Sequence, residues 1–132
     1  MPSPSFYFTF ASISGAVGVT AGAFGAHALK SKLNAHQLSS WQTAVSYQLL
    51  HSVALLYVSG LKGGAGGASF AAAAFSSGIT LFSGSIYALC LTSDGNPLRK
   101  IAGPLTPLGG LALIAGWAAL AIRRPGLPPP RL

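Results

Sequence analysis

Long stretches without charge constrain what this chain can fold into, and the first of them constrains it most. Residues 6–26 are apolar or small throughout. A helix rises 1.5 Å per residue, so this stretch is long enough to cross a hydrocarbon core of about 30 Å. Of the 132 residues 51% are hydrophobic and only 7% are charged, against about 25% charged in a typical soluble domain. We therefore predict a single integral membrane domain.

Three further membrane-spanning helices are predicted, at about 41–61, 69–91 and 105–122. Ser39 or Ser40 is the expected N-cap of the second helix. The Gly-rich connection after it is too short to recross a membrane, so the second and third helices form a hairpin. The turn cluster T-S-D-G-N-P ends the third helix, with Asp94 capping or turning the backbone. Pro104 or Pro107 is expected near the start of the fourth helix, where N–H groups are free.

The predicted fold is an all-α bundle of four transmembrane helices with both termini on the same side, followed by a Pro-rich tail at 125–132. Small residues line one side of the first helix and one side of the fourth. The two stripes are Gly15, Gly18, Gly22 and Gly25, and Gly109, Ala112, Gly116 and Ala119. Their spacing of three, four and three residues stacks each set on one helical face. We predict close helix contacts at both stripes, within the bundle or against a partner.

The second helix is the least apolar of the four and carries a candidate polar cluster. Tyr47, Gln48 and His51 are three and four residues apart, which places them on one face. That face is expected to be buried in protein, since polar groups turned to lipid would remain unsatisfied.

Residues near the ends of the predicted spans carry interfacial signals. His27, Trp41 and Trp117 are expected at the membrane interfaces. The basic residues divide equally between the two ends of the bundle, with Lys62, Arg123, Arg124 and Arg131 at the end of the termini and Lys30, Lys32, Arg99 and Lys100 at the other. The positive-inside rule therefore does not orient the chain.

The histidines suggest two alternatives to a structural role. His51, with Tyr47 and Gln48, could pass a proton in a small transporter or channel. His27 and His51 could bind a haem between them, but His51 lies about 15 Å deeper along its helix. No buried carboxylate is available to pair with His51, and His36 is expected to be solvated in a loop. Structural hydrogen bonding explains the same residues, so no cofactor and no metal is predicted.

The composition and motifs argue against an enzyme and against a nucleic-acid-binding protein. One acidic residue cannot supply the carboxylate pair of general acid–base catalysis. Ser83 lies in F-S-G-S, which lacks the G-x-S-x-G of a nucleophile elbow. The G-G-A-G-G segment lacks the Lys-Ser/Thr of a phosphate loop and any strand before it. The net charge of +7 is scattered between apolar runs, as suits lipid headgroups and not nucleic acid. The single cysteine, Cys90, excludes an intrachain disulfide.

Four segments of the chain resemble one known family. They are G-A-F-G-A-H-A-L-K at 22–30, A-V-S-Y-Q-L-L-H-S-V-A-L-L at 44–56, L-F-S-G-S-I-Y-A-L at 81–89 and L-T-P-L-G-G-L-A-L-I-A-G-W at 105–117. In this order they resemble the domain of unknown function 423 family, which includes YgdD-like and transmembrane protein 256-like proteins. The resemblance implies a small four-helix membrane protein of bacterial inner membranes and eukaryotes, without an assigned reaction. Ala28, Ser46 and the Pro-rich tail depart from many relatives.

These observations together predict a non-enzymatic accessory subunit packed in a larger membrane complex. Its partners would be the lipid bilayer, bound lipids and other membrane-protein subunits, and no nucleic acid. The N-terminal residues lack the basic region of a signal peptide and the Arg-rich pattern of a transit peptide. A respiratory-chain type of complex in the mitochondrial inner membrane is the favoured location, with a thylakoid or plasma membrane as rivals.

Overall fold

A computed structural model describes residues 2–61 and 67–123, which form four α-helices joined by short connections. The helices are α1 (Pro4–Ala26), α2 (Ala35–Gly60), α3 (Gly67–Leu91) and α4 (Leu98–Arg123). No strand occurs within these ranges, so the described chain is all-α. Lys62, Arg124 and the predicted Pro-rich tail at 125–132 lie outside the described residues.

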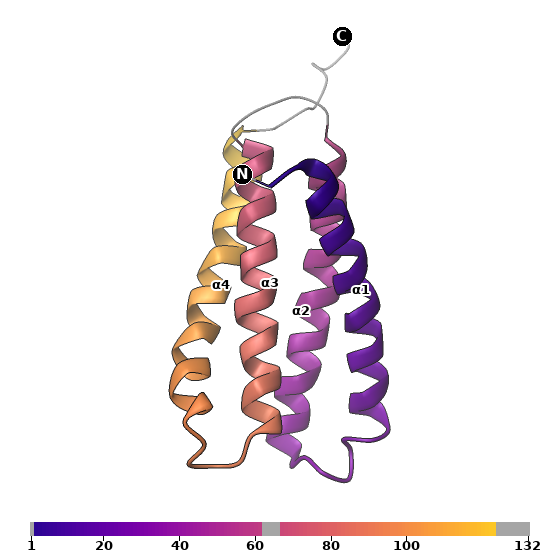
Figure 1. The fold of residues 1–132 in the computed structure, drawn as a ribbon, viewed down its shortest axis with the longest axis vertical. Helices are drawn as coiled ribbons and strands as arrows, with labels where there is room; N and C mark the ends of the chain where they lie inside the picture. Colours follow the sequence, from indigo (N-terminus) through magenta and orange to yellow (C-terminus); the bar gives the residue numbers. More distant parts are fainter. Residues whose placement is uncertain (1, 62–66, 124–132) are drawn as a thin grey trace.

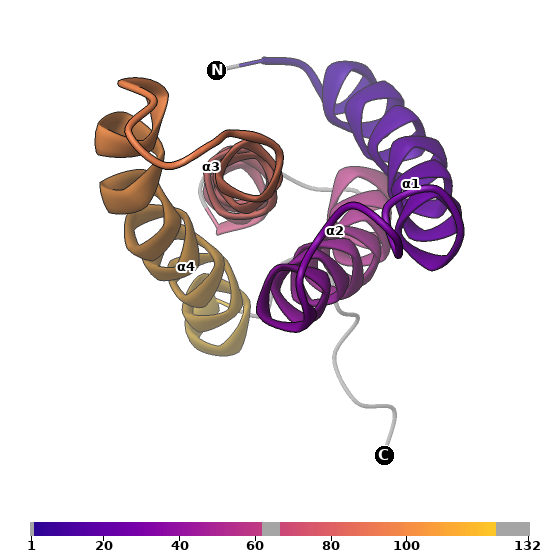
Figure 2. The same ribbon diagram turned by 90° about the horizontal axis from the view of Figure 1, so that it is seen from below.

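The helices are arranged as two hairpins side by side. In Figures 1 and 2, α2 and α3 lie between α1 and α4, which occupy the two edges. The main packing pairs are α1 with α2, α2 with α3, and α3 with α4. The first turn of α1 and the last turn of α4 lie at the same end of the bundle, and the α1–α2 and α3–α4 connections lie at the other (Figure 1).

The second helix begins at Ala35, so the predicted start near residue 41 and the predicted N-cap at Ser39 or Ser40 are wrong. Asn34 is the N-cap. Its side-chain oxygen accepts a hydrogen bond from the Gln37 backbone N–H at 2.8 Å, and the Gln37 side chain accepts one from the Asn34 backbone N–H at 2.9 Å. This reciprocal capping satisfies two N–H groups at the helix start and adds more than one turn to α2.

The fourth helix begins at Leu98, so the predicted start at residue 105 is wrong as well. Asn96, and not Asp94, caps it by accepting a hydrogen bond from the Leu98 backbone N–H at 2.9 Å. Both prolines, Pro104 and Pro107, therefore lie inside the helix. A proline deprives the carbonyl four residues earlier of its N–H partner. Here both carbonyls lie in the first two turns of α4, close to the end of the bundle.

Three of the four helices are long and apolar enough to cross a membrane: the segments are Pro4–Ala26, Ala68–Leu91 and Leu98–Ile122. The second helix is not among them. It has 26 residues, which is a comparable length, but several of its side chains are polar. Of these, Gln48, His51 and Ser52 are buried against neighbouring helices, whereas Gln42 and Tyr47 are exposed.

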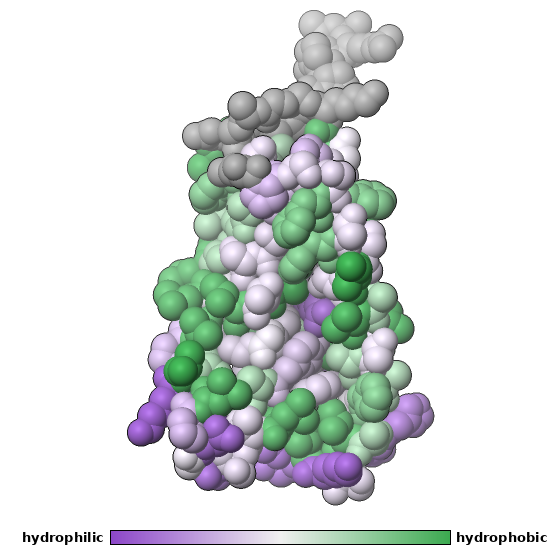
Figure 3. Space-filling model, viewed as in Figure 1, coloured by the Kyte–Doolittle hydropathy of each residue, from purple (hydrophilic) through white to green (hydrophobic). Residues whose placement is uncertain are grey.

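Large apolar side chains cover much of the outer surface of the bundle. On the edge helices they include Val19 of α1 and Ile114 of α4, both well exposed. Figure 3 shows hydrophobic residues along the middle of the molecule and hydrophilic ones gathered at the end that holds the α1–α2 and α3–α4 connections. An outer surface of this kind is suited to a hydrocarbon solvent and not to water.

Candidate functional site

The interior of the bundle contains a chain of polar side chains centred on Gln48 of α2. Its side-chain nitrogen donates to the Ser14 carbonyl of α1 at 2.9 Å, and its side-chain oxygen accepts from the Tyr87 hydroxyl of α3 at 2.7 Å. Gln48 and Ser14 are both buried. One amide group thereby joins three helices, because both its nitrogen and its oxygen are used.

Serine and threonine hydroxyls extend this network along the helix contacts. The Ser52 hydroxyl lies 2.8 Å from the Ser14 hydroxyl and 2.7 Å from the Gln48 carbonyl. Since a hydroxyl has one hydrogen, Ser52 donates it to one of these two oxygens at a time. Ser83 of α3 donates to the Ala44 carbonyl of α2 at 2.8 Å. Ser83 is the serine whose F-S-G-S sequence was compared above with a nucleophile elbow. Its side chain is buried, and its hydrogen bond joins α3 to α2.

His51 forms a second polar link, between α2 and α4. Its Nδ1 lies 2.7 Å from the Tyr47 carbonyl, and its Nε2 lies 3.1 Å from Nε1 of Trp117. A carbonyl can only accept and an indole N–H can only donate, so Nδ1 carries the hydrogen and Nε2 accepts. The arrangement therefore suits the neutral ring, and both of its nitrogens are occupied.

Tyr47 does not belong to a buried cluster with Gln48 and His51. Its side chain is 43% exposed, so the expectation that it is buried is wrong. Its ring packs against Phe82 of α3, with 4.8 Å between the ring centroids. Gln48 points towards α1 and α3 while His51 points towards α4. Because consecutive residues on a helix differ by 100° in direction, residues that share a broad face can still contact different neighbours.

The three predicted interfacial residues occupy different environments. Trp41 is only 6% exposed and donates from Nε1 to the Ala21 carbonyl of α1 at 2.8 Å, so it faces the interior and not the headgroups. Trp117 is 46% exposed, with its indole N–H on His51. His27 is exposed at the C-terminal cap of α1. His36 is also exposed, but it lies in the first turn of α2 and not in a loop.

The glycine stripe of α1 faces α2. A Cβ on Gly18 would lie 2.8 Å from the Leu49 side chain, and one on Gly25 would lie 2.6 Å from Trp41. Gly22 lies next to Val45 in the same way. Gly15 is different, since a Cβ there would meet nothing within 4 Å. Gly18, Gly22 and Gly25 thus leave space for large side chains of α2. The glycine stripe therefore forms a helix contact within the bundle.

The small-residue stripe of α4 faces α3. A Cβ on Gly109 would collide with the α3 backbone at Phe82, and one on Gly116 would lie 2.6 Å from the Phe75 ring. Ala112 and Ala119 are partly buried. Among the described glycines, Gly109 is the one at which an added Cβ would come closest to the backbone of a neighbouring helix. This explains why α3 and α4 pack so extensively.

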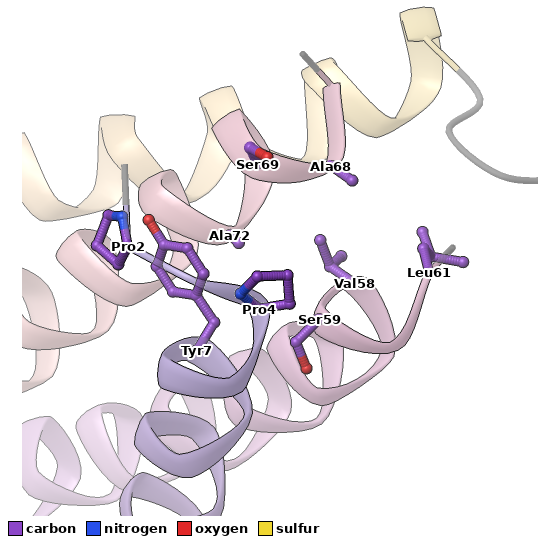
Figure 4. Close-up of a pocket in the computed structure, with 9 residues that line it drawn as sticks. All are labelled: Pro2, Pro4, Tyr7, Val58, Ser59, Leu61, Ala68, Ser69 and Ala72. Carbon is purple, nitrogen blue, oxygen red and sulfur yellow. The ribbon is translucent and has the colours of Figure 1, made fainter. Parts of the chain in front are cut away.

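Two of the cavities in the described structure lie at opposite ends of the bundle. The smaller, of about 190 Å³, is formed by the first turn of α1, the end of α2 and the start of α3, and Tyr7 lines it (Figure 4). The larger, of about 450 Å³, lies between α2, α3 and α4 at the end that holds the connections. Arg99 lines this cavity. Its Nη1 donates to the Leu89 and Thr92 carbonyls at 2.6 and 2.9 Å, which provides hydrogen-bond partners for carbonyl groups at the end of α3.

The buried polar groups bond to one another and to backbone carbonyls of the helices. Within residues 2–61 and 67–123, no group of three His, Cys, Asp or Glu side chains is placed to bind a metal ion. Every fully buried side-chain nitrogen or oxygen in these ranges has a hydrogen-bond partner. The arrangement is therefore one that holds helices together.

Comparison with known proteins places the chain in a family. The model of the family described as "Protein of unknown function (DUF423)" matches residues 21–110. The chain belongs to this family. The DUF423 match runs from the last turns of α1 to the middle of α4, so it includes Gln48, His51 and the whole of α2 and α3. The resemblance found in the four sequence segments is confirmed.

Relatives of this DUF423 protein occur in fungi and bacteria. It is 42% identical to a UPF0382 membrane protein of Schizosaccharomyces pombe, over 85% of this chain and 95% of the relative. It is 37% identical to one of Staphylococcus aureus, over 88% and 92%, and 35% identical to YwdK of Bacillus subtilis, over 88% and 93%. No solved structure matches the chain. The DUF423 protein is thus a small integral membrane protein.

Proposed function

We propose that this protein is a non-enzymatic accessory subunit that packs within a larger membrane complex. The observation that carries the proposal is the closed polar interior. Gln48 uses both ends of its amide on neighbouring helices, and the buried serines bond to carbonyls or to each other. When the buried polar groups of the described residues all bond to other groups of the bundle, none of them is left to bind a substrate. This supports a protein that acts through its outer surface.

The geometry of His51 favours this proposal over a proton-conducting channel. A relay histidine must take up a proton on one nitrogen and release it from the other. Here Trp117 donates to Nε2 and the Tyr47 carbonyl faces Nδ1, so both nitrogens are engaged by groups that cannot pass a proton on. The same occupancy argues against His51 as a haem ligand, since an axial ligand needs a free ring nitrogen.

The outer surface suggests where partners would bind. The edge helices α1 and α4 expose large apolar side chains, and the connections described are short. Partners would therefore pack within the bilayer, against the edge helices. The location that we favour is an energy-coupling membrane, with a respiratory-chain complex of the mitochondrial inner membrane as the first candidate. A membrane protein shared by bacteria and a fungus is compatible with that location.

The test is the size of the native particle. After extraction of membranes in a mild detergent, the chain is expected to migrate with a larger complex whose other subunits are identified by mass spectrometry. Migration of the chain by itself or only with copies of itself would contradict the proposal.

A flux measurement tests the transport alternative. Liposomes containing the purified chain are expected to show no more proton flux than empty liposomes, with or without the substitution His51→Leu. Flux that the wild type supports and His51→Leu abolishes would favour the channel instead.

A further inference from the structure

The larger cavity combines polar walls with an apolar wall. Two of its sides come from α2 and α4, on which the lining residues recur at helical spacing: His36, Ser40 and Thr43, and Arg99, Gly103 and Thr106. Ile86 and Leu89 of α3 form the apolar side. Spacings of four and three residues keep each set on one face of its helix. The cavity therefore has polar walls from α2 and α4 and an apolar wall from α3.

The charge around this cavity is positive. Arg99 lines it, and Lys100 follows in the sequence. Both α2 and α4 begin at this end of the bundle (Figure 1), and the negative end of α3, which also lies here, is capped by Arg99. No acidic residue lines the cavity. The one acidic residue of the chain, Asp94, lies 3.5 Å from Arg99 and its side chain is fully exposed.

Arg99 is fixed in place yet keeps donors for a ligand. Its Nη1 group is held by the Leu89 and Thr92 carbonyls, and its side chain is 31% exposed. A guanidinium has five N–H donors, of which Nη1 supplies two. The remaining donors belong to Nε and Nη2, and Nη2 faces only the solvated Asp94 carboxylate. A guanidinium already held by two bonds loses little freedom when it binds an anion.

Gly103 keeps the cavity open. A Cβ at this position would meet nothing within 4 Å, unlike the glycines that pack against neighbouring helices. Glycine is unfavourable inside a helix by about 1 kcal/mol relative to alanine, and here no helix contact accounts for it. Space beside a fixed cation, at the end of a membrane bundle, is what a lipid headgroup with its adjoining chain requires.

We propose that this cavity binds one anionic phospholipid. The phosphate would be bound by Arg99, the neighbouring polar atoms would come from His36 and Ser40, and the first part of an acyl chain would lie against Ile86 and Leu89. A free phosphate ion would satisfy Arg99 equally well but would leave the apolar wall uncovered. The apolar wall and the position within a membrane protein favour the lipid.

The first test compares lipids on the delipidated full-length chain in detergent. Binding of phosphatidylglycerol and of phosphatidylcholine is measured by native mass spectrometry at increasing lipid concentration. Both lipids carry an anionic phosphate, but the positive choline group of phosphatidylcholine is repelled by the positive charge around the cavity, so we expect phosphatidylglycerol to bind about tenfold more tightly or better. Arg99→Gln is expected to remove that preference, whereas Lys100→Gln, which loses the same charge outside the cavity, retains most of it.

Two further substitutions test the cavity itself. Gly103→Leu fills open space and is expected to abolish the preference for phosphatidylglycerol while the helical circular dichroism and the thermal unfolding temperature are retained. Asp94→Asn removes the competing carboxylate beside Arg99 and is expected to tighten binding of phosphatidylglycerol.

Three results would overturn the proposal. They are equal binding of the two lipids, an equal loss of the preference in Arg99→Gln and Lys100→Gln, and an unchanged preference in a folded Gly103→Leu variant. Inorganic phosphate is the last probe. If millimolar phosphate displaces phosphatidylglycerol completely, the site is one for a free anion and the lipid assignment is wrong.

Discussion

Single polar residues hold this membrane bundle together because each of their atoms has one defined partner. Gln48 bonds to the Ser14 carbonyl through its nitrogen and to the Tyr87 hydroxyl through its oxygen. His51 uses one nitrogen within α2 and the other on α4. In hydrocarbon no water replaces a lost partner, so each of these bonds has a defined consequence when it is removed.

Gln48→Leu should lower the free energy of unfolding by about 1–3 kcal/mol, because the Tyr87 hydroxyl and the Ser14 carbonyl lose their bonds to a buried amide. Unfolding in mixed micelles with increasing dodecyl sulfate measures this change. Gln42→Leu is the matched control, since Gln42 is exposed on the same helix. An equal effect of the two substitutions would mean that the buried network contributes nothing beyond hydrophobicity.

At the scale of helices, side-chain size decides how closely neighbours approach. The α1–α2 contact places large side chains of α2 over glycines of α1, as Trp41 lies over Gly25. The α3–α4 contact is tighter, because Gly109 faces the α3 backbone itself. A side chain can rotate away from an added methyl group, but a backbone within a helix cannot.

Gly109→Ala should therefore destabilise the protein by about 1–3 kcal/mol, through separation of α3 from α4. Gly15→Ala is the control, since a Cβ at Gly15 meets nothing. It should leave stability unchanged or raise it by up to about 1 kcal/mol through helix propensity. The same unfolding titration measures both. Similar values for the two variants would show that the close approach at Gly109 is not maintained in the membrane.

For the whole molecule, the number of membrane crossings depends on α2. Composition alone identifies α1, α3 and α4 as apolar enough to span. Yet α2 lies between α1 and α3 and is as long as they are (Figure 2). Gln48 and His51 are buried and bond to groups of the other three helices, so α2 can still lie at membrane depth although composition alone does not identify it as a span. We predict that all four helices cross the bilayer.

Cysteine labelling tests this prediction. In a Cys90→Ser background, single cysteines are introduced by Ser3→Cys, Lys32→Cys and Ser93→Cys, all at exposed positions. With four crossings, a membrane-impermeant maleimide should label the Lys32 and Ser93 variants from one side and the Ser3 variant only from the other. If α2 does not cross, the Lys32 and Ser93 positions will be labelled from opposite sides.

The sequence by itself determined the helical class, the approximate positions of the helices and the small-residue faces at which they approach. These are local properties, because the length of an apolar run and the spacing of glycines can be read within one segment. The ends of α2 and α4 were less predictable. The capping side chains of Asn34 and Gln37 start α2 earlier than predicted. Asn96 caps α4 ahead of Pro104 and Pro107, so these two prolines do not mark the start of that helix.

Only the tertiary structure decided which polar residues act together. The partners of Gln48 lie 34 and 39 residues away along the chain, and Ser14 and Tyr87 have no local pattern that marks them. Likewise Trp41 is buried and Tyr47 is exposed, the reverse of what their positions suggest. The rotation of each helix about its axis fixes these outcomes. That rotation is set by packing against neighbours, which no single segment of the sequence contains.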